Sequence, residues 1–330
     1  MDENLHKRCL QFIIDRDAVK AAFPMGNSAF YPVCASLFTD KGIPADTAHL
    51  KACYKLFKEK LNVFSNFRGM AEVSLVSMIA CGENPEERLE NAVEMYRVLK
   101  EHFWGSTYLP VAAVILASAV DREEYVAVAE KAKGIYDLMK QAHRFITSEE
   151  DSVFAAMLAL SSRTPEEIVA EAEECFAVLK EHFYTRNAVQ SLSHVLALVE
   201  DDMRTAKDKC RDTVALYESL KAKGYKYGTD YELATLGTLA MLPCGIEETV
   251  RDVIEVDGFL SQQKGYGFFG VGKKQRLMHA GMLVVSERSG DCQTMQSAAT
   301  GSTISMVAAQ HAATCAAITA SVVVSNAATR

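Results

Sequence analysis

The chain has 330 residues, 49% of them hydrophobic, and a formal net charge of −8 at pH 7. This composition is typical of a globular protein with a sizeable core, and the negative charge argues against a nucleic-acid partner, because phosphate backbones are bound by an excess of Lys and Arg. The nine cysteines are odd in number and show no Cys-x-x-Cys spacing, so we expect free thiols and no metal.

The N-terminal 45 residues predict a helical hairpin. Met1 to Asn4 include two acids where a secretory signal needs basic residues, so we expect a cytoplasmic protein. Phe12 lies on an amphipathic first helix, residues 31–38 form an apolar second helix, and Pro24 and Gly26 lie between them. We expect residues 1–45 to be a degenerate capping unit with one side toward water.

From residue 46 to residue 288 one unit recurs six times. Each unit has an aromatic anchor on an amphipathic helix, a loop, and a second helix that is apolar throughout. The anchors, 40 to 42 residues apart, are Tyr54, Tyr96, Tyr136, Phe176, Tyr217 and Phe259. In five units a lysine follows four residues later, where it complements the negative end of the helix dipole: Lys58, Lys100, Lys140, Lys180 and Lys221. The second helices are predicted at residues 71–80, 109–119, 153–160, 189–199, 231–242 and 277–285.

These elements predict an all-α fold of stacked two-helix repeats of about 41 residues, forming one continuous body. The stack is either an open α-solenoid, that is an α/α superhelix, or a ring closed into an α/α toroid. Closure of six units requires each to turn by about 60°, more than in ordinary solenoids. No sequence feature determines that angle.

Residues 289–330 break the repeat and are rich in Ser and Ala. Residues 304–324 are long enough to span a bilayer, but they include Gln310, His311 and several Ser and Thr residues. We expect a linker and a terminal helix that packs on the last unit or on a second subunit, as in a homodimer. A membrane span and disorder are the alternatives.

The loops from first to second helix carry aromatic and charged side chains, and stacking in register brings these loops to one edge of the molecule. Exposed aromatic residues beside charges are typical of recognition surfaces. The alternative is that the aromatic residues only hold each hairpin together. The loop residues are Phe67, Arg68, Trp104, Tyr108, Phe145, Tyr184, Arg186, Asn187, Tyr227, Asp230, Tyr231, Phe268 and Phe269.

The last loop also resembles a phosphate-binding loop, since Gly267 and Gly272 have the required spacing and Lys273 follows. Lys274, however, occupies the position of the magnesium-binding Ser or Thr, and a helix precedes the loop where a strand is required. A weaker hypothesis is a glycine-rich turn at a helix N-terminus that binds a phosphate or carboxylate with Lys273, Lys274 and Arg276. A solvated turn is the alternative.

Several strings resemble a bacterial protein family, the domain of unknown function 4003. They are Tyr96–Phe103, Phe145–Thr147 followed by Glu150-Asp151, Gly265–Gly272 and Met278–Met282. The resemblance covers nearly all of the chain. It implies a bacterial, intracellular setting and no particular activity, cofactor or catalytic residue.

Two functions of different classes follow. The first is a binding or scaffold module that uses the loop edge or a concave face to bind a protein, a peptide or a small anionic ligand. The second is an enzyme with a central pocket in a closed ring, for a small anionic or polar substrate. Its candidate residues are Trp104, Tyr108, Arg186, Asp230, Tyr231 and Lys273. We expect no cofactor, and neither nucleic acid nor a membrane as a partner.

Overall fold

The computed structural model describes residues 1–69, 71–201, 203–267 and 270–289. Throughout these ranges the regular structure is helical, with fourteen α-helices, the short 3-10 helices η1 (Asn66–Arg68) and η2 (Arg122–Glu124), and no strand. The predicted all-α class is therefore confirmed. Within the same ranges, no helix has both the length and the apolar character needed to cross a bilayer. The predicted C-terminal helix lies outside the described residues.

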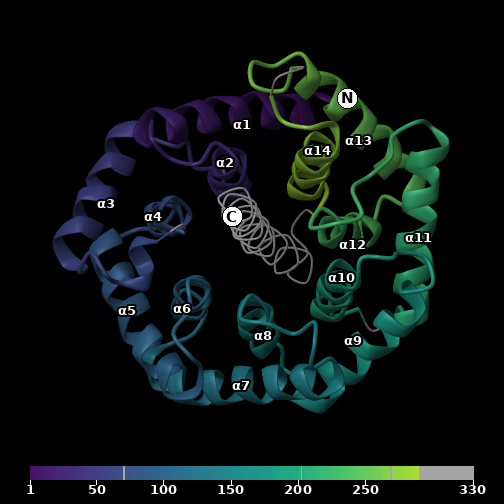
Figure 1. The fold of residues 1–330 in the computed structure, drawn as a ribbon. Helices are drawn as coiled ribbons and strands as arrows, with labels where there is room; N and C mark the ends of the chain where they lie inside the picture. The colour runs from purple at the N-terminus through teal and green to yellow at the C-terminus, as the bar shows by residue number, and fades with distance from the viewer. Residues whose placement is uncertain (70, 202, 268–269, 290–330) are drawn as a thin grey trace, which may run out of the picture.

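The helices alternate between an outer and an inner layer (Figure 1). The outer helices are α1 (Glu3–Ala22), α3 (Thr47–Lys60), α5 (Pro85–His102), α7 (Tyr125–Ala142), α9 (Pro165–Leu179), α11 (Ala206–Ala222) and α13 (Ile246–Ser261). The inner helices are α2 (Phe30–Lys41), α4 (Glu72–Ala80), α6 (Leu109–Ala117), α8 (Asp151–Ala159), α10 (Arg186–Leu198), α12 (Leu233–Ala240) and α14 (Lys273–Arg288). The predicted second helices agree with the inner helices within a few residues.

The residue pattern of each layer explains its position. In α5 the buried residues Leu89, Ala92, Met95 and Leu99 are three or four residues apart, so they form one apolar stripe on an otherwise polar helix. In α6 every residue from Leu109 to Leu116 is buried, as expected for a helix covered on all sides. The aromatic anchors Tyr54 and Tyr96 lie at the margin of the outer-helix stripes and are half-buried.

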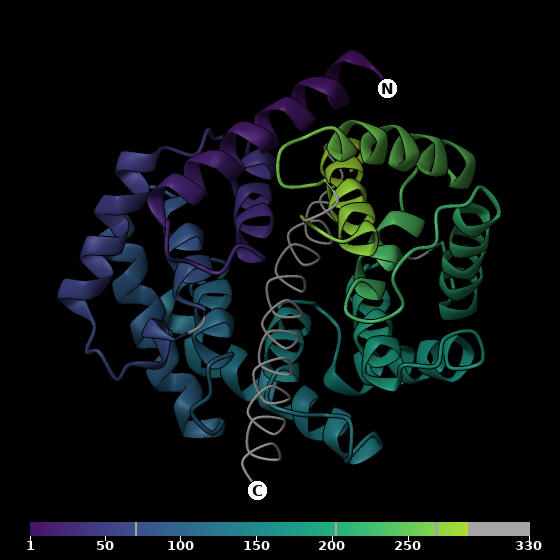
Figure 2. The ribbon, with the colours of Figure 1, turned by 45° about the horizontal axis from the view of Figure 1, so that its top comes forward.

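Each inner helix contacts the next inner helix, each outer helix contacts the next outer helix, and both series return to their start. Helix α14 contacts α1 and α2, and α13 contacts α1 (Figures 1 and 2). The first hairpin therefore has neighbours on both sides, whereas the sequence led us to expect one side toward water. The reason is that α1 and α2 occupy the place between the last hairpin and the second.

Side chains join the first and last helices across this seam. Arg8 donates to Glu287 Oε2 at 2.6 Å and to Ser286 Oγ at 2.8 Å, and Arg288 pairs with both Asp2 and Asp252. Helix α1 also connects two core clusters. Its Leu5, Cys9 and Phe12 belong to the cluster that holds residues 175–285, while its Val19 and Ala22 belong to the cluster of the N-terminal half.

Candidate functional site

The loops that lead from each outer helix to its inner helix share one face of the molecule. The starts of neighbouring inner helices are joined, since Gln190 donates to Thr147 Oγ1 at 2.8 Å and Thr185 to Asp230 Oδ1 at 3.1 Å. Their ends are joined as well, for example by Arg88, which donates to Met78 O and to Ser118 Oγ. The inner helices are therefore parallel. We call the side with their starts the aromatic face; its loops are residues 23–29, 61–69, 103–108, 143–150, 180–185, 223–232 and 262–267.

One group of rings on this face is buried and connects consecutive hairpins. Phe103 lies edge-on against Tyr136 of the next outer helix, with ring centroids 5.5 Å apart, and Phe183 lies the same way against Tyr217 at 5.1 Å. Three further loop rings meet the next anchor: Phe23 on Tyr54, Phe67 on Tyr96, and His143 on Phe176. These rings join one hairpin to the next, whereas the alternative stated above was that they only hold their own hairpin together.

A second group of side chains, next to the buried rings, extends into solvent. Trp104 follows buried Phe103 and is 92% exposed, and Tyr184 follows buried Phe183 and is 93% exposed. The loops of three other hairpins also hold a side chain exposed to between 91% and 98%: Met25, Phe64 and Phe145. Five consecutive hairpins thus each present one large apolar side chain on the aromatic face. Phe268 and Phe269 of the last loop lie outside the described residues.

The structure divides the predicted site residues near α6, α10 and α12 into exposed and buried ones. Arg186 and Asn187 begin α10 and are exposed, like Trp104. Tyr108 is buried just before α6. Tyr227 is fully buried, and its hydroxyl lies 2.6 Å from Thr235 Oγ1. Burial raises the pKa of Tyr227 well above its ordinary value. Tyr108 and Tyr227 therefore belong to the core and are not available to a ligand.

Four of the remaining predicted residues meet where the last two inner helices begin. Lys274 Nζ lies 3.9 Å from Asp230 Oδ2, which links the starts of α14 and α12. Tyr231 accepts a hydrogen bond from Gln275, and burial raises the pKa of Tyr231 to about 12. Lys273 lies over the ring of Tyr225, 5.5 Å from its centroid. These contacts form a polar cluster that joins hairpins and leaves Lys273 and Lys274 exposed.

Arg276 is not part of an exposed anion site. Its guanidinium donates to both carboxylate oxygens of Asp257, at 2.8 and 3.0 Å, and Asp257 is buried. The paired guanidinium satisfies this buried charge, which would otherwise be costly. The predicted anion-binding turn thus loses one of its three cations to the core.

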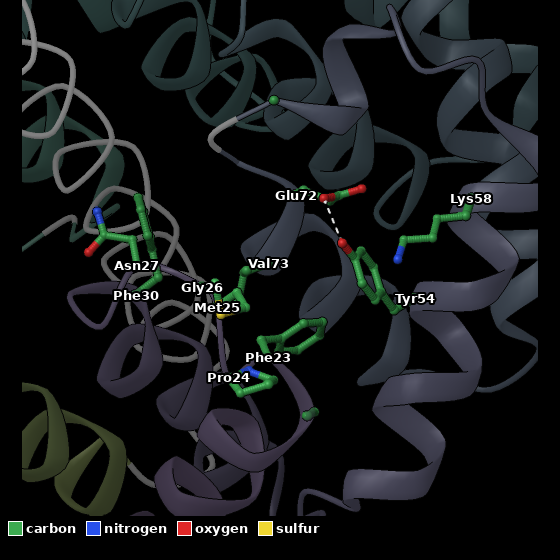
Figure 3. Close-up of a pocket in the computed structure, with 12 residues that line it drawn as sticks. Phe23, Pro24, Met25, Gly26, Asn27, Phe30, Tyr54, Lys58, Glu72 and Val73 are labelled. Carbon is green, nitrogen blue, oxygen red and sulfur yellow. Dashed lines mark hydrogen bonds between the residues drawn. The ribbon is translucent and has the colours of Figure 1, made fainter.

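A pocket of about 590 Å³ opens between the loops of the first and second hairpins (Figure 3). Its walls include Met25 and Asn27 from the first loop, and Tyr54, Lys58 and Glu72 from the second hairpin. The Tyr54 hydroxyl donates to Glu72 Oε2 at 3.3 Å, and Lys58 Nζ lies 3.9 Å from the centroid of the Tyr54 ring (Figure 3). From the sequence, Tyr54 and Lys58 are predicted as parts of the repeat, and this pocket is not predicted. The available signal was the Pro24–Asn27 loop beside them.

Among the described residues no three His, Cys, Asp or Glu side chains lie close enough together to hold a metal ion. Seven cysteines fall within the described ranges, all as free thiols, and six of them are buried. Burial raises the pKa of the Cys34 thiol to about 11, which disfavours the reactive thiolate.

Comparison with known proteins gives one match. The family model described as "Protein of unknown function (DUF4003)" matches residues 17–312. No functionally curated protein and no solved structure matches the chain.

Proposed function

Because the chain belongs to the DUF4003 family, whose description assigns no activity, we propose its function from its own geometry: a closed α/α ring of seven helical hairpins that binds a ligand on its aromatic face. The ring is supported by the contacts of α14 with α1 and α2. With seven hairpins each turns by about 51°, less than six would require. The first hairpin takes the place of the seventh unit.

One observation carries the binding function: five consecutive hairpins each have a large apolar side chain more than nine-tenths exposed in the loop that lies on the aromatic face. Single exposed apolar residues are normal on a protein surface and need no explanation. A recurrence in consecutive hairpins is different, because each such side chain forgoes about 1.5–3 kcal/mol of burial free energy. A ligand that covers the aromatic face would recover part of that free energy.

Trp104 provides the test, since it is the one tryptophan of the chain and lies on this face. We expect a ligand of the aromatic face to shift Trp104 emission to shorter wavelength and to reduce its quenching by acrylamide. The panel should contain acidic peptides, phosphates, carboxylates, oligosaccharides and lipid vesicles. The binding function is abandoned if no member of the panel changes the emission while the protein stays folded by circular dichroism.

The pocket between the first two hairpins favours a second candidate, binding or turnover of a small polar or anionic molecule. Its volume of about 590 Å³ is in the range of small-molecule sites. Lys58 offers a cation and Glu72 a carboxylate at its wall. A thermal-shift screen tests this candidate, because a ligand at about 100 times its Kd adds about 2.7 kcal/mol of stability. Hits should disappear in Lys58→Met and remain in Lys207→Met, which changes an exposed lysine of α11.

A further inference from the structure

The aromatic face carries unpaired cations beside its exposed apolar side chains. Five exposed cations of this face form no ion pair with any described residue: Arg144, Arg186, Lys223, Lys226 and Lys264. Arg144 precedes Phe145 directly, and Arg186 lies two residues after Tyr184. In the loops of this face the exposed acids are Glu149, Glu181 and Asp230, and Lys274 already pairs with Asp230. Unpaired cations thus lie beside Phe145 and Tyr184, and the other three lie in the loops of residues 223–232 and 262–267.

The opposite face, where the inner helices end and the next outer helices begin, has the reverse charge. First turns of the outer helices contain pairs of acids at Glu86-Glu87, Glu166-Glu167 and Glu247-Glu248, and η2 contains Glu123-Glu124. We call this side the acidic face. Acid pairs thus gather at the starts of the outer helices, where Glu86 pairs with Lys60 and Glu248 pairs with Arg251. Such a charge distribution orients the protein in the field of a charged partner.

The inner helices increase this asymmetry. Their N-termini all lie at the aromatic face, and none has an N-cap side chain that accepts a hydrogen bond. Five of them, α2, α6, α10, α12 and α14, also lack an acid in the first turn. Ser106 Oγ accepts from Leu109 N at the start of α6, and the other N-termini add partial positive charge, which attracts anions.

We infer that the aromatic face docks on the surface of a bilayer that contains anionic phospholipid, an inference that rests on the proposed binding function. The five exposed apolar side chains come from five hairpins, and neighbouring helices lie about 8–10 Å apart, so these side chains form separate points around a ring. A flat, deformable surface meets all of them at once, whereas a peptide groove requires adjoining apolar walls. Trp, Tyr and Phe with Lys and Arg are the residues of membrane interfaces.

Docking of this kind reverses the expectation that a membrane is not a partner, and it differs from the membrane span considered for residues 304–324. It needs no apolar helix, since side chains enter the headgroup region and cations remain among the anionic lipids. Binding is then reversible and weakened by salt, because the Debye length falls from about 10 Å at 0.1 M salt to about 3 Å at 1 M. An acidic protein is the other occupant that the charge would fit, and the experiment below separates the two.

The test uses the full chain with two kinds of vesicle, phosphatidylcholine alone and phosphatidylcholine with 30% phosphatidylserine. Cosedimentation and Trp104 emission are measured together. We expect sedimentation and a shift of Trp104 emission to shorter wavelength with the anionic vesicles only, and release as the salt concentration rises. Equal binding to both kinds of vesicle, or sedimentation without an emission change, overturns the inference.

Matched variants locate the contact while keeping Trp104 as reporter. The double variant Phe145→Ser/Tyr184→Ser should weaken vesicle binding at least tenfold. Arg144→Gln/Lys226→Gln should also weaken it at least tenfold at low salt, because each Lys or Arg near an anionic surface contributes about fivefold. Met203 is 91% exposed on the acidic face, so Met203→Ser should bind as the wild type does. A Met203→Ser variant as weak as Phe145→Ser/Tyr184→Ser overturns the inference.

Soluble poly-glutamate separates failure of this inference from failure of the proposed function. If poly-glutamate shifts Trp104 emission and the vesicles do not, the membrane inference is wrong and the binding face remains. If no member of the full ligand panel shifts it, both proposals fail. The changed side chains are nearly fully exposed, so we expect unchanged circular dichroism and Tm in all variants.

Discussion

The aromatic and acidic faces hold the same helices together by different means. At the acidic face, side chains bind the free carbonyl groups at the ends of inner helices. Lys209, for example, donates to Glu171 Oε1 at 2.6 Å, to Leu196 O at 3.1 Å and to Val199 O at 2.5 Å. At the aromatic face, rings of one hairpin pack on the anchor of the next. At the acidic face the helices are thus held by hydrogen bonds, each of which is lost when its donor or acceptor is replaced. At the aromatic face the exposed residues beside the packed rings can be replaced without loss of the ring contacts.

Carboxyl groups show the same contrast. On the acidic face Glu167 and Asp208 accept hydrogen bonds from Thr164 and Thr205, which lowers the pKa of both. At the aromatic face burial raises the pKa of Glu150, Asp151 and Glu232. The hydrogen bonds at the acidic face thus favour the charged forms of Glu167 and Asp208. Burial at the aromatic face disfavours the charged forms of Glu150, Asp151 and Glu232.

The largest effect should come from the buried lysine of the acidic face. Lys209→Met leaves two carbonyl groups and part of Glu171 without a donor, and removal of one partner of a buried pair costs about 3–5 kcal/mol. Urea unfolding measures the loss. Lys207→Met is the control, since Lys207 is 75% exposed and should change stability by less than about 0.5 kcal/mol. Equal losses in the two variants would mean that the acidic face is not fixed in this way.

The adjacent pair Phe183 and Tyr184 tests the aromatic face. Phe183→Ala removes a buried ring from its contact with Tyr217 and should cost about 3–4 kcal/mol. Tyr184→Ala changes a side chain that is 93% exposed and should be neutral within about 0.5 kcal/mol. Denaturant unfolding of both variants checks the difference. A costly Tyr184→Ala would show that the exposed residues serve the fold and are not free for a ligand.

Asp151 makes stability depend on pH in a definite direction. Burial raises its pKa from 3.8 to about 7, so the folded protein binds this proton more tightly than the unfolded chain does. The stability that Asp151 contributes is present below pH 4 and lost as the pH rises toward 7. Relative to the wild type, Asp151→Asn should therefore gain roughly 4 kcal/mol of stability between pH 4 and pH 8. A difference that is flat with pH contradicts the buried neutral carboxyl.

His194, 3.9 Å from Asp151, acts in the opposite sense. Burial lowers the pKa of His194 to about 3, so its contribution is present above pH 6.5 and lost on acidification. The wild type and Asp151→Asn share this loss. The difference between their free energies of unfolding at each pH therefore reports the titration of the Asp151 carboxyl group alone.

The smallest effect is expected at an exposed helix start of the acidic face. Thr164 and Glu167 form a reciprocal capping box at α9, with Thr164 N donating to Glu167 Oε2 at 2.9 Å. Thr164→Ala should cost about 1 kcal/mol, whereas Thr164→Ser should cost less because the hydroxyl remains. Thr185→Ala is the comparison at the aromatic face, since Thr185 precedes α10 without accepting a capping bond and loses only its exposed hydrogen bond to Asp230. A Thr185→Ala loss as large as that of Thr164→Ala would remove the difference between the two ends.

The helical class and the approximate bounds of the inner helices follow from the sequence, because an apolar run between two amphipathic helices indicates a helix that is covered on all sides. The opposite burial of Phe103 and Trp104 does not follow from residue type. A signal did exist: Phe103, His143 and Phe183 each stand seven residues after their anchor, on the same side of the helix, whereas Trp104 and Tyr184 stand one residue further on. Closure of the helix series was not predictable, since it depends on the angle between hairpins.

The seam between α1 and α14 has a consequence for synthesis of the chain. Leu5, Cys9 and Phe12 are covered by residues that the ribosome adds far later, because about 250 residues separate the end of α1 from the start of α14. At a translation rate of about 5–20 residues per second, α14 is synthesised about 12–50 s after α1, and the apolar stripe of α1 lacks this cover until then. We therefore expect the nascent N-terminal helix to expose this apolar stripe until translation of the last hairpin is complete.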